Sequence, residues 1–288
     1  MNINHLRYFQ EVCKYSNITK AAKELHISQP SVTAAIKDLE KELGFDLFHR
    51  INHRIYLTDQ GREFLLRTND FIQEYKNFQS LSMEIGHNAR FTIKLGIPTV
   101  FSTYLLQHIL PGLKAACPNI NLEMYEVPTF TVYDMLQDDA VDLSLGIITP
   151  QQQNRLIIEP LFTTRLVLSI NKNNPLAKEA LIDDSMLKNQ PFVIVPKGSF
   201  HFEEIFKKYP SVVPNILLHS NQLSTITYTL EQDLAASILC AEIFAEHPDI
   251  ATIPMKDSIP VPIGIMWNKN KTLTNALKSF IDYTKSVF

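Results

Sequence analysis

The clearest pattern in the first sixty residues is an apolar stripe at helical spacing, preceded by a shorter helical pattern. Its members fall three or four positions apart and would share one helix face: Val32, Ala35, Ile36, Leu39 and Leu43. Ser28 can cap this helix, Pro30 suits its first turn, and Gly44 marks its end. The shorter pattern covers residues 20–25, with Thr19 as its expected cap. Together they predict two helices joined by a tight turn.

The opposite face of the second helix carries side chains that can read DNA. These are short or amide-bearing near the start, with a cation one turn later: Gln29, Ser31, Thr33, Ala34 and Lys37. Two strand patterns follow at residues 47–50 and 54–57, and they predict a hairpin whose Arg50 and Arg54 contact phosphates or a minor groove. Without this hairpin, a small amphipathic helix with a solvated polar face explains the pattern about equally well.

A seven-residue apolar repeat follows the hairpin. Its members are Phe64, Phe71, Phe78 and Ile85. Thr58 is the expected cap of the corresponding helix, and Gly86 its expected end. Such a repeat is typical of a helix that pairs with another copy. The alternative is a long helix packed on its own domain, but about thirty residues exceed what one small domain usually covers.

From residue 91 onward the pattern changes to alternating strands and helices. The expected strands are residues 92–97, 120–127, 143–148, 166–170, 192–195, 216–219, 237–240, 251–254 and 263–267. The expected helices are residues 104–117, 132–138, 201–208, 223–232 and 272–286. This alternation predicts an α/β fold with mainly parallel strands, and such sheets bind ligands at the carboxyl ends of their strands. The alternation by itself does not indicate a function.

The charge of the chain is close to balanced. The 288 residues carry a net charge of −3, with 45% hydrophobic and 20% charged residues, as in ordinary globular proteins. Residues 1–62 hold nine Lys and Arg against seven Asp and Glu, which leaves eighteen against twenty-three for the remainder. A single copy is therefore expected to bind DNA poorly, and dimerisation, which doubles the contacts, is expected to be needed.

Several functional classes find no support in the sequence. With eight glycines, no Gly-rich phosphate loop and no Ser/His/Asp or Cys/His signature, neither nucleotide binding nor an enzyme is predicted. The first residues do not resemble a signal peptide, and no apolar run reaches membrane-spanning length. Cys13, Cys117 and Cys240 lack metal-ligand spacing and fit small buried hydrophobes. We expect no metal, no cofactor and a reducing, cytoplasmic compartment.

A set of residues between positions 6 and 61 matches a family pattern. It comprises Leu6-Arg7-Tyr8-Phe9, Thr19-Lys20-Ala21-Ala22, Leu25, Ser28-Gln29-Pro30-Ser31-Val32-Thr33, Ile36, Leu39-Glu40, Leu43-Gly44, Leu47-Phe48, Arg50, Leu57-Thr58 and Gly61. This set resembles the winged helix–turn–helix of LysR-type transcriptional regulators. The resemblance implies DNA contacts at Gln29, Pro30, Ser31, Thr33, Ala34 and Lys37, with Arg50 and Arg54 in the wing. Ala34 replaces a longer polar or basic residue of many members, so base readout is expected to rest more on Gln29, Ser31 and Thr33.

The rest of the chain resembles the effector domain of the same family. The matching residues are Leu95-Gly96, Tyr104-Leu105-Leu106, Leu110-Pro111, Leu136, Asp138, Val141-Asp142-Leu143, Glu159-Pro160-Leu161-Phe162, Leu166-Val167-Leu168 and Asn174-Pro175-Leu176-Ala177. The resemblance implies a DNA-binding domain over residues 1–58, a dimerisation helix over 59–88, and a two-lobed domain over 91–288. That domain would be like type 2 periplasmic binding proteins, with lobe I at about 91–161 plus 266–288 and lobe II at about 162–265.

The resemblance also implies an effector site between the lobes. Its residues would be Pro98, Thr99, Thr129, Ser199, Phe200 and His201. Hydroxyls and backbone donors at helix starts favour an anionic group, so a small carboxylate-bearing metabolite is the expected effector. Helix capping alone is the alternative role of each hydroxyl. His201 replaces a small hydroxyl residue of many members, which makes the cleft bulkier and pH-sensitive. Usual glycines are replaced by Asp139, Asp233 and Ala235.

These expectations describe a sequence-specific, DNA-binding transcriptional regulator under effector control. Its expected partners are a double-stranded DNA operator, a small-molecule effector, one or three further copies of the chain, and RNA polymerase, with no membrane. Two alternatives stay open. One is a cytoplasmic solute-binding protein without a gene-regulatory role, and the other is a DNA-binding protein whose cleft stays empty. A shift in DNA binding caused by a metabolite would separate the regulator from the second alternative.

Overall fold

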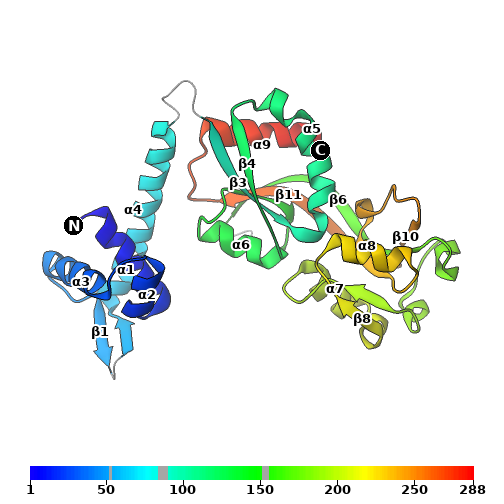
Figure 1. Ribbon diagram of the computed structural model, residues 1–288, viewed down its shortest axis with the longest axis horizontal. Helices are drawn as coiled ribbons and strands as arrows, with labels where there is room; N and C mark the ends of the chain where they lie inside the picture. The colour runs from blue at the N-terminus through cyan, green and yellow to red at the C-terminus, as the bar shows by residue number, and fades with distance from the viewer. Residues whose placement is uncertain (52–53, 84–89, 151–155) are drawn as a thin grey trace. The chain divides into compact units, whose positions relative to one another are not determined.

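A computed structural model of the protein describes residues 1–51, 54–83, 90–150 and 156–288. The chain divides into two compact units (Figure 1): residues 1–87 with 270–272, and residues 88–269 with 273–288. The described residues contain no helix that is long and apolar enough to cross a membrane.

The first unit is a small helical domain with a two-stranded hairpin. Its elements are α1 (Ile3–Tyr15), α2 (Ile18–Glu24), α3 (Gln29–Leu43), β1 (Phe48–Ile51), β2 (Arg54–Leu57) and α4 (Asp59–Met83). The apolar stripe predicted for α3 is buried, since Val32, Ile36 and Leu39 are at most 2% exposed. Phe9 of α1 packs between Phe48 of β1 and Phe64 of α4, with ring centroids 5.5 and 5.3 Å away. The helices therefore bury their apolar faces in one shared core.

Most of the predicted helix boundaries of this unit are confirmed. Ser28 Oγ accepts from the Ser31 amide, and Gly44 ends α3 with φ of 77°. Thr58 Oγ1 accepts from the Gly61 amide at 2.8 Å and so caps α4. The predicted cap of α2 was wrong, because Asn17 Oδ1 accepts from the Lys20 amide at 2.9 Å. The helix begins one residue before Thr19, and the extended backbone at Asn17 lets its short side chain reach that amide.

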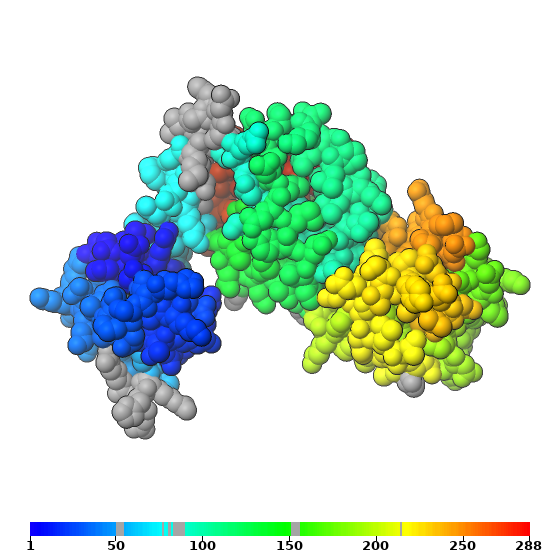
Figure 2. All heavy atoms as spheres, in the orientation of Figure 1, coloured from blue at the N-terminus to red at the C-terminus, as the bar shows by residue number. Residues whose placement is uncertain are grey.

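The second unit consists of two lobes that share one long strand. Lobe I contains β3 (Phe91–Pro98), the 3₁₀ turn η1 (Thr99–Phe101), α5 (Ser102–Ala116), β4 (Ile120–Val127), α6 (Thr129–Gln137), β5 (Leu143–Ile147), the first part of β6 (Leu156–Asn171), β11 (Pro260–Asn268) and α9 (Asn275–Val287). Lobe II contains the rest of β6, η3 (Pro175–Lys178), η4 (Asp184–Leu187), β7 (Phe192–Ile194), α7 (Phe200–Lys208), η5 (Pro210–Asn215), β8 (Ile216–His219), α8 (Leu223–Glu231), β9 (Ser237–Cys240), η6 (Ala241–Ile243) and β10 (Ile250–Pro254). The lobes form two masses in the space-filling view, green for lobe I and yellow to orange for lobe II (Figure 2).

The long strand β6 connects the two lobes. Residues 156–165 of β6 pair with β11 in lobe I, and residues 166–171 pair with β9 and β10 in lobe II. The sheet order is β10-β6-β11-β5-β3-β4, with β9 on the other side of β6. The predicted positions of the strands are confirmed, but the expectation of mainly parallel pairing was wrong. Among the described pairs of named strands in this unit, only β3 with β4 and β5, and β7 with β8, are parallel. Because β6 leaves lobe I and β11 returns to it, these neighbours run in opposite directions and pair antiparallel.

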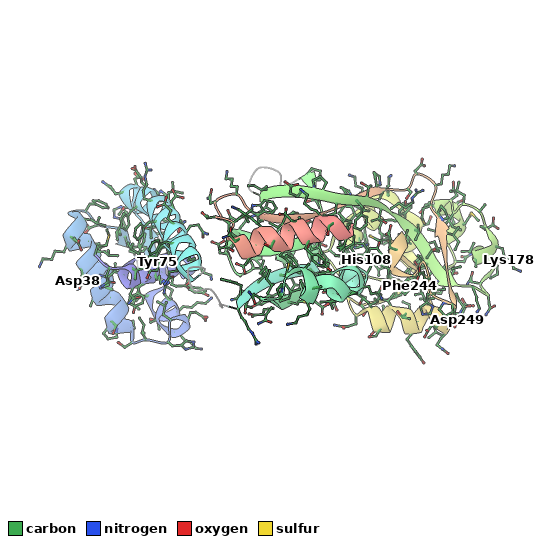
Figure 3. All side chains as sticks on the ribbon, turned by 90° about the horizontal axis from the view of Figure 1, so that it is seen from above. Asp38, Tyr75, His108, Lys178, Phe244 and Asp249 are labelled. Atoms are coloured by element: carbon green, nitrogen blue, oxygen red, sulfur yellow. The ribbon has the colours of Figure 1, made fainter. Side chains whose placement is uncertain are left out.

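Helices cover both faces of the lobe I sheet. β5 is buried along its whole length, as expected for a strand covered on both sides. α5 and α9 pack together on one face, where the Tyr283 hydroxyl donates to the Ile109 carbonyl at 2.6 Å. His108 of α5 lies beside α9 (Figure 3), and its ring is 5.2 Å from that of Phe288. Val132 and Leu136 of α6 are buried on the other face.

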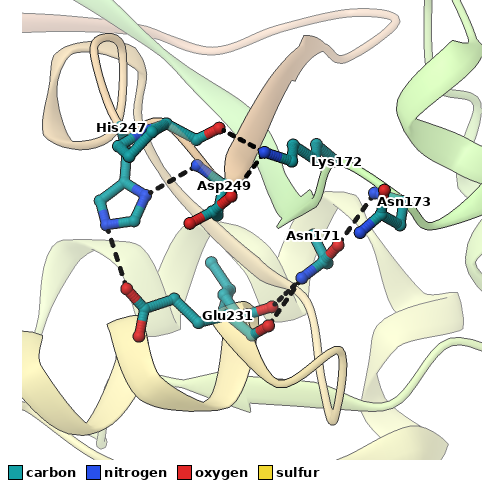
Figure 4. Close-up of polar contacts among 8 residues, drawn as sticks. Asn171, Lys172, Asn173, Glu231, His247 and Asp249 are labelled. Atoms are coloured by element: carbon teal, nitrogen blue, oxygen red, sulfur yellow. Dashed lines mark hydrogen bonds and ion pairs between the residues drawn. The ribbon is translucent and has the colours of Figure 1, made fainter.

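A network of polar contacts in lobe II involves the residues at the end of β6. Lys172, just after β6, donates to Asp249 Oδ1 at 2.5 Å, and this contact lowers the pKa of the Asp249 carboxyl. The neighbouring Asn171 donates to the Glu231 carbonyl at 2.7 Å (Figure 4). His247 Nε2 lies 3.4 Å from Glu231 Oε1. These contacts hold the end of β6, the end of α8 and the loop before β10 together.

Two of the three glycine replacements lie where the backbone is left-handed. Asp139 and Asp233 follow the ends of α6 and α8, each with φ of 52°. Asp is one of the few residues other than glycine that adopt this conformation with any frequency. Ala235 has no positive φ. The fold therefore keeps the turns that glycine usually makes at the first two positions.

Candidate nucleic-acid interface and ligand pocket

The outer face of α3 is exposed and holds an ordered set of polar side chains. Gln29, Pro30, Ser31, Ala34 and Lys37 are all exposed, and Thr33 is partly buried beside them. The N-terminal end of a helix in this position can enter a major groove. The six residues thus share one accessible face, and five of them leave their side chains open to a partner.

Two hydrogen-bonded pairs order the start of that face. Gln29 Nε2 donates to Thr33 Oγ1 at 2.9 Å, and Thr33 Oγ1 donates to the Gln29 carbonyl at 3.0 Å. Ser28 Oγ and Ser31 Oγ lie 2.7 Å apart, with Ser28 also capping the helix. The side chains on the first turn and a half of α3 are therefore partly preorganised.

Partly buried hydrogen bonds connect the start of the hairpin to α3 and to the cap of α4. Glu40 Oε1 of α3 accepts from the Leu47 amide at 2.9 Å, and Thr58 Oγ1 donates to the Asp46 carbonyl at 2.7 Å. A side chain on Gly61 would meet the Leu47 carbonyl oxygen at 2.2 Å, so only glycine fits there. Arg50 and Arg54 lie on β1 and β2, but their side chains lie outside the described part of the chain.

Two residues predicted for the end of the long helix, Ile85 and Gly86, also lie outside the described residues.

A pocket opens where lobes I and II meet. It contains about 380 Å³ of space, part of which is open to solvent. Its lining residues are Pro98, Thr99, Val100, Pro128, Thr129, Val195, Pro196, Ser199, His201 and Asn221. These come from the loops that follow β3, β4, β7 and β8. The pocket is thus formed at the carboxyl ends of parallel strands from both lobes.

Five of the six residues predicted for an effector site line this pocket, and Phe200 is not among its lining residues. Phe200 begins α7, and its side chain packs against the hydrophobic core. Successive residues of a helix point about 100° apart, and here Phe200 is directed at the core while His201 is directed at the pocket. Sequence reasoning missed Asn221. It lies shortly after β8 at the carboxyl end of a strand, where such sheets bind ligands, so that general rule could have found it.

The hydroxyls of the pocket differ in their hydrogen bonding. Ser199 Oγ accepts from the Phe202 amide at 3.1 Å and donates to the Pro196 carbonyl at 2.9 Å, so it caps α7. Thr99 Oγ1 is buried and has no partner among the described residues. Of these two hydroxyls, Thr99 therefore has its hydrogen-bonding capacity unused, whereas Ser199 already makes both of its bonds.

His201 is buried in the wall of the pocket. It is 2% exposed, and its Nε2 lies 3.5 Å from Cys240 Sγ of β9. Burial disfavours the charged imidazolium and lowers the pKa of His201 to about 4. Burial also raises the pKa of the Cys240 thiol. Both groups are consequently neutral at pH 7, and the described residues include no cluster of His, Cys, Asp and Glu that could hold a metal ion.

One backbone hydrogen bond connects the two lobes next to the pocket. The Phe130 amide in the first turn of α6 donates to the Gly198 carbonyl in the loop before α7, at 3.4 Å. Gly198 has φ of 91°, a conformation that a side chain would strain. Lobe I and lobe II thus touch directly beside Thr129 and Ser199.

Two family models match the chain. The model described as "Bacterial regulatory helix-turn-helix protein, lysR family" matches residues 3–62, and "LysR substrate binding domain" matches residues 87–288. An uncharacterised HTH-type transcriptional regulator of Bacillus subtilis, YcgK, is 32% identical over 69% of this chain and 66% of its own. The HTH-type transcriptional regulator TdcA of Escherichia coli is 25% identical over 98% of this chain and 91% of its own.

Solved structures show the same fold over the whole chain. A full-length OxyR variant from Pseudomonas aeruginosa covers 99% of this chain and 95% of its own, with 21% identity and a TM-score of 0.68. Full-length CbnR in complex with its target DNA covers 100% of both chains, with 21% identity and a TM-score of 0.58. The winged helix–turn–helix and the two-lobed α/β domain predicted from the sequence are confirmed by these matches.

Proposed function

Because this chain belongs to the LysR family of bacterial DNA-binding transcriptional regulators, we propose that α3 reads its operator and that a small effector bound between lobes I and II controls its activity. The proposal rests chiefly on the exposed face of α3, which presents Gln29, Ser31 and Lys37 together. Pro30, Thr33 and Ala34 complete this face, and Arg50 and Arg54 of the hairpin would contact the DNA backbone. The proposed domains are residues 1–58, 59–88 and 91–288.

We propose an anionic effector for the pocket. The described lining residues include no carboxylate that would repel an anion, and no charged cation that would hold one. An anion would therefore be held by Thr99 Oγ1 and by backbone amides at the start of η1 and α6. The apolar lining of Pro98, Val100 and Val195 suits the carbon skeleton of a small carboxylic acid. Thr129, Ser199 and His201 would complete its wall.

We propose that two chains pair through α4 and that two pairs can form a tetramer. Phe71 and Phe78, which lie seven residues apart on one face of α4, are 50% and 69% exposed, and pairing would bury them. Paired chains would offer two α3 helices to successive major grooves, and four could bend the DNA between two sites. Effector binding would then change the packing of the dimers and the recruitment of RNA polymerase. This activity belongs in the cytoplasm, where the operator is accessible.

The solute-binding alternative without a regulatory role has no support, because the helix–turn–helix model matches residues 3–62. Family members are transcription factors rather than enzymes.

The test of the proposed function is to map where the purified full chain binds sheared DNA of its own source at physiological salt. Discrete sites with a pseudo-palindromic core are expected, and Gln29→Ala should weaken the preference among them. Lys178→Ala, an exposed change in lobe II, is the matched control. Featureless binding, or sites that Gln29→Ala leaves unchanged, would contradict the assignment of α3 as the reading helix.

A further inference from the structure

The start of α3 contains a closed hydrogen-bond circuit between Gln29 and Thr33. Gln29 Nε2 donates to Thr33 Oγ1 at 2.9 Å, while Thr33 Oγ1 donates to the Gln29 main-chain carbonyl at 3.0 Å. Both side chains sit one turn apart on the same helix face, as residues at i and i+4 do. We propose that Thr33 is a positioning residue that fixes the amide of Gln29 for adenine, and that it does not read a base itself. This inference rests on the proposed function of α3.

The Thr33 hydroxyl can form only a small number of hydrogen bonds. A hydroxyl has one proton to donate and two lone pairs that accept. Its proton goes to the Gln29 carbonyl, and one lone pair accepts from Gln29 Nε2. Thr33 is also less exposed than Gln29. Thr33 consequently has no proton left to give to a base edge while this circuit holds.

The bond to Thr33 determines the orientation of the Gln29 amide. If the amide were flipped, its oxygen would face the Thr33 oxygen, whose only proton is already directed at the main chain. While that proton stays on the main-chain carbonyl, two acceptors would then oppose each other, and the NH₂ group is the end that fits toward Thr33. The circuit therefore fixes which end of the Gln29 side chain faces outward.

The oriented Gln29 amide keeps a donor and an acceptor for hydrogen bonds to a base. One N–H of Gln29 is used by Thr33, which leaves the other N–H and both lone pairs of Oε1 accessible on an exposed side chain. A donor beside an acceptor matches the N7 and N6 positions of adenine in the major groove. Holding a flexible side chain in advance also lowers the entropy lost on binding. Thr33 would thus raise specificity without touching DNA.

The experiment measures base preference with the full-length protein. Equilibrium selection from an operator library randomised at every position is followed by sequencing, for wild type, Gln29→Ala, Thr33→Val, Thr33→Ser and the double variant Gln29→Ala/Thr33→Val. Gln29→Ala should lose the preference for adenine at one position per half-site, by roughly 5- to 150-fold. Thr33→Val should lose part of the preference at that same position, and Thr33→Ser, which keeps the hydroxyl, should restore it.

The double variant separates positioning from direct readout. If Thr33 acts only through Gln29, adding Thr33→Val to Gln29→Ala causes no further loss. Thr19→Val, the same exchange on an exposed residue of α2, is the matched control, and circular dichroism checks the helix content of each variant. A Thr33→Val effect at a different base pair, an additive effect in the double variant, or no effect at all would overturn the inference. A Gln29→Ala variant with unchanged preference at every position would instead overturn the proposed function of α3.

Discussion

His201 lies in the first turn of α7, with its ring enclosed by lobe II and one side on the wall of the pocket. From the sequence alone it suggested a pH-sensitive cleft, because an ordinary histidine titrates near pH 6.5. Burial lowers its pKa to about 4, so the ring stays neutral throughout the physiological range. The burial of His201, which the sequence alone does not reveal, therefore makes it a neutral hydrogen-bonding group and not the pH-sensitive residue that was expected.

The lowered pKa of His201 predicts a pH dependence of stability. The unfolded chain binds a proton near pH 6.5 and the folded chain only near pH 4, so stability falls as the pH drops from 6.5 towards 4. Between pH 7 and pH 5 this residue should cost about 2 kcal/mol. Urea unfolding at both pH values should show a smaller loss for His201→Gln. Equal losses in wild type and variant would contradict the assigned pKa.

His26 offers a test of backbone strain at the turn between α2 and α3. It is exposed and has φ of 55°, in the left-handed region that costs about 1–2 kcal/mol for residues other than glycine. His26→Gly should therefore raise the stability of the DNA-binding unit by about 0.5 kcal/mol, after the loss of chain entropy. His49→Gly, on strand β1, is the control and should lower stability instead. Thermal unfolding of both variants measures the difference, and equal signs would contradict the argument.

Among the elements, α4 shows how far a sequence pattern leads. The seven-residue repeat predicts one apolar face, yet Phe64 packs on Phe9 in the core while Phe71 and Phe78 are exposed. The first turns of the helix belong to their own unit, and only the later turns are left for a partner. The repeat alone could not separate the core residues from the pairing residues, because it does not show how far along α4 the contact with α1 extends.

Changing one exposed aromatic residue of α4 should separate the paired chains. Phe78→Lys places a charge where an apolar contact is proposed, and sedimentation should show mainly monomer at concentrations where wild type is dimeric. Gln79→Lys adds the same charge at the neighbouring exposed position and should leave the dimer intact. A dimeric Phe78→Lys protein would mean that another surface joins the chains.

The sequence predicts the positions of these elements better than their directions or their contacts. Caps such as Ser28 and Thr58 and the strand at residues 120–127 follow from local rules, since turn chemistry and alternation are local. The antiparallel pairing of β6 with β11 depends on residues about a hundred positions apart and has no local signal. In the pocket, the family resemblance predicted Thr99 correctly as a lining residue, whereas the packing of Phe200 against the core depends on tertiary contacts that no local pattern specifies.

On the scale of the whole molecule, the two lobes are joined by more than a hinge. One continuous hydrophobic core includes Leu95 and Ile265 of lobe I together with Leu168 and Ile238 of lobe II. β6 runs through both lobes, and the Phe130–Gly198 hydrogen bond connects them again. These shared elements should make lobes I and II unfold as one cooperative unit.

The single tryptophan reports on this cooperativity. Trp267 is 5% exposed in β11, within lobe I. Ile238→Ala removes a buried side chain from β9 of lobe II and should cost about 2–5 kcal/mol. We expect the urea midpoint of Trp267 fluorescence to fall in this variant. Ile36→Ala, in the α3 core of the other unit, is the matched control and should leave that midpoint unchanged. An unchanged midpoint in Ile238→Ala would show that the lobes unfold separately.

The return of β11 and α9 to lobe I has a consequence for how the protein is made. β11 lies between β5 and β6 in the sheet, and α9 packs on α5, although both come last in the chain. A ribosome that has released residues 91–171 has therefore supplied only part of the lobe I sheet, while every strand of lobe II is complete by residue 254. Vectorial synthesis thus allows lobe II to fold on the nascent chain before lobe I. The apolar edges of β5 and β6 stay open in the meantime, and this interval is when the growing chain most needs a chaperone.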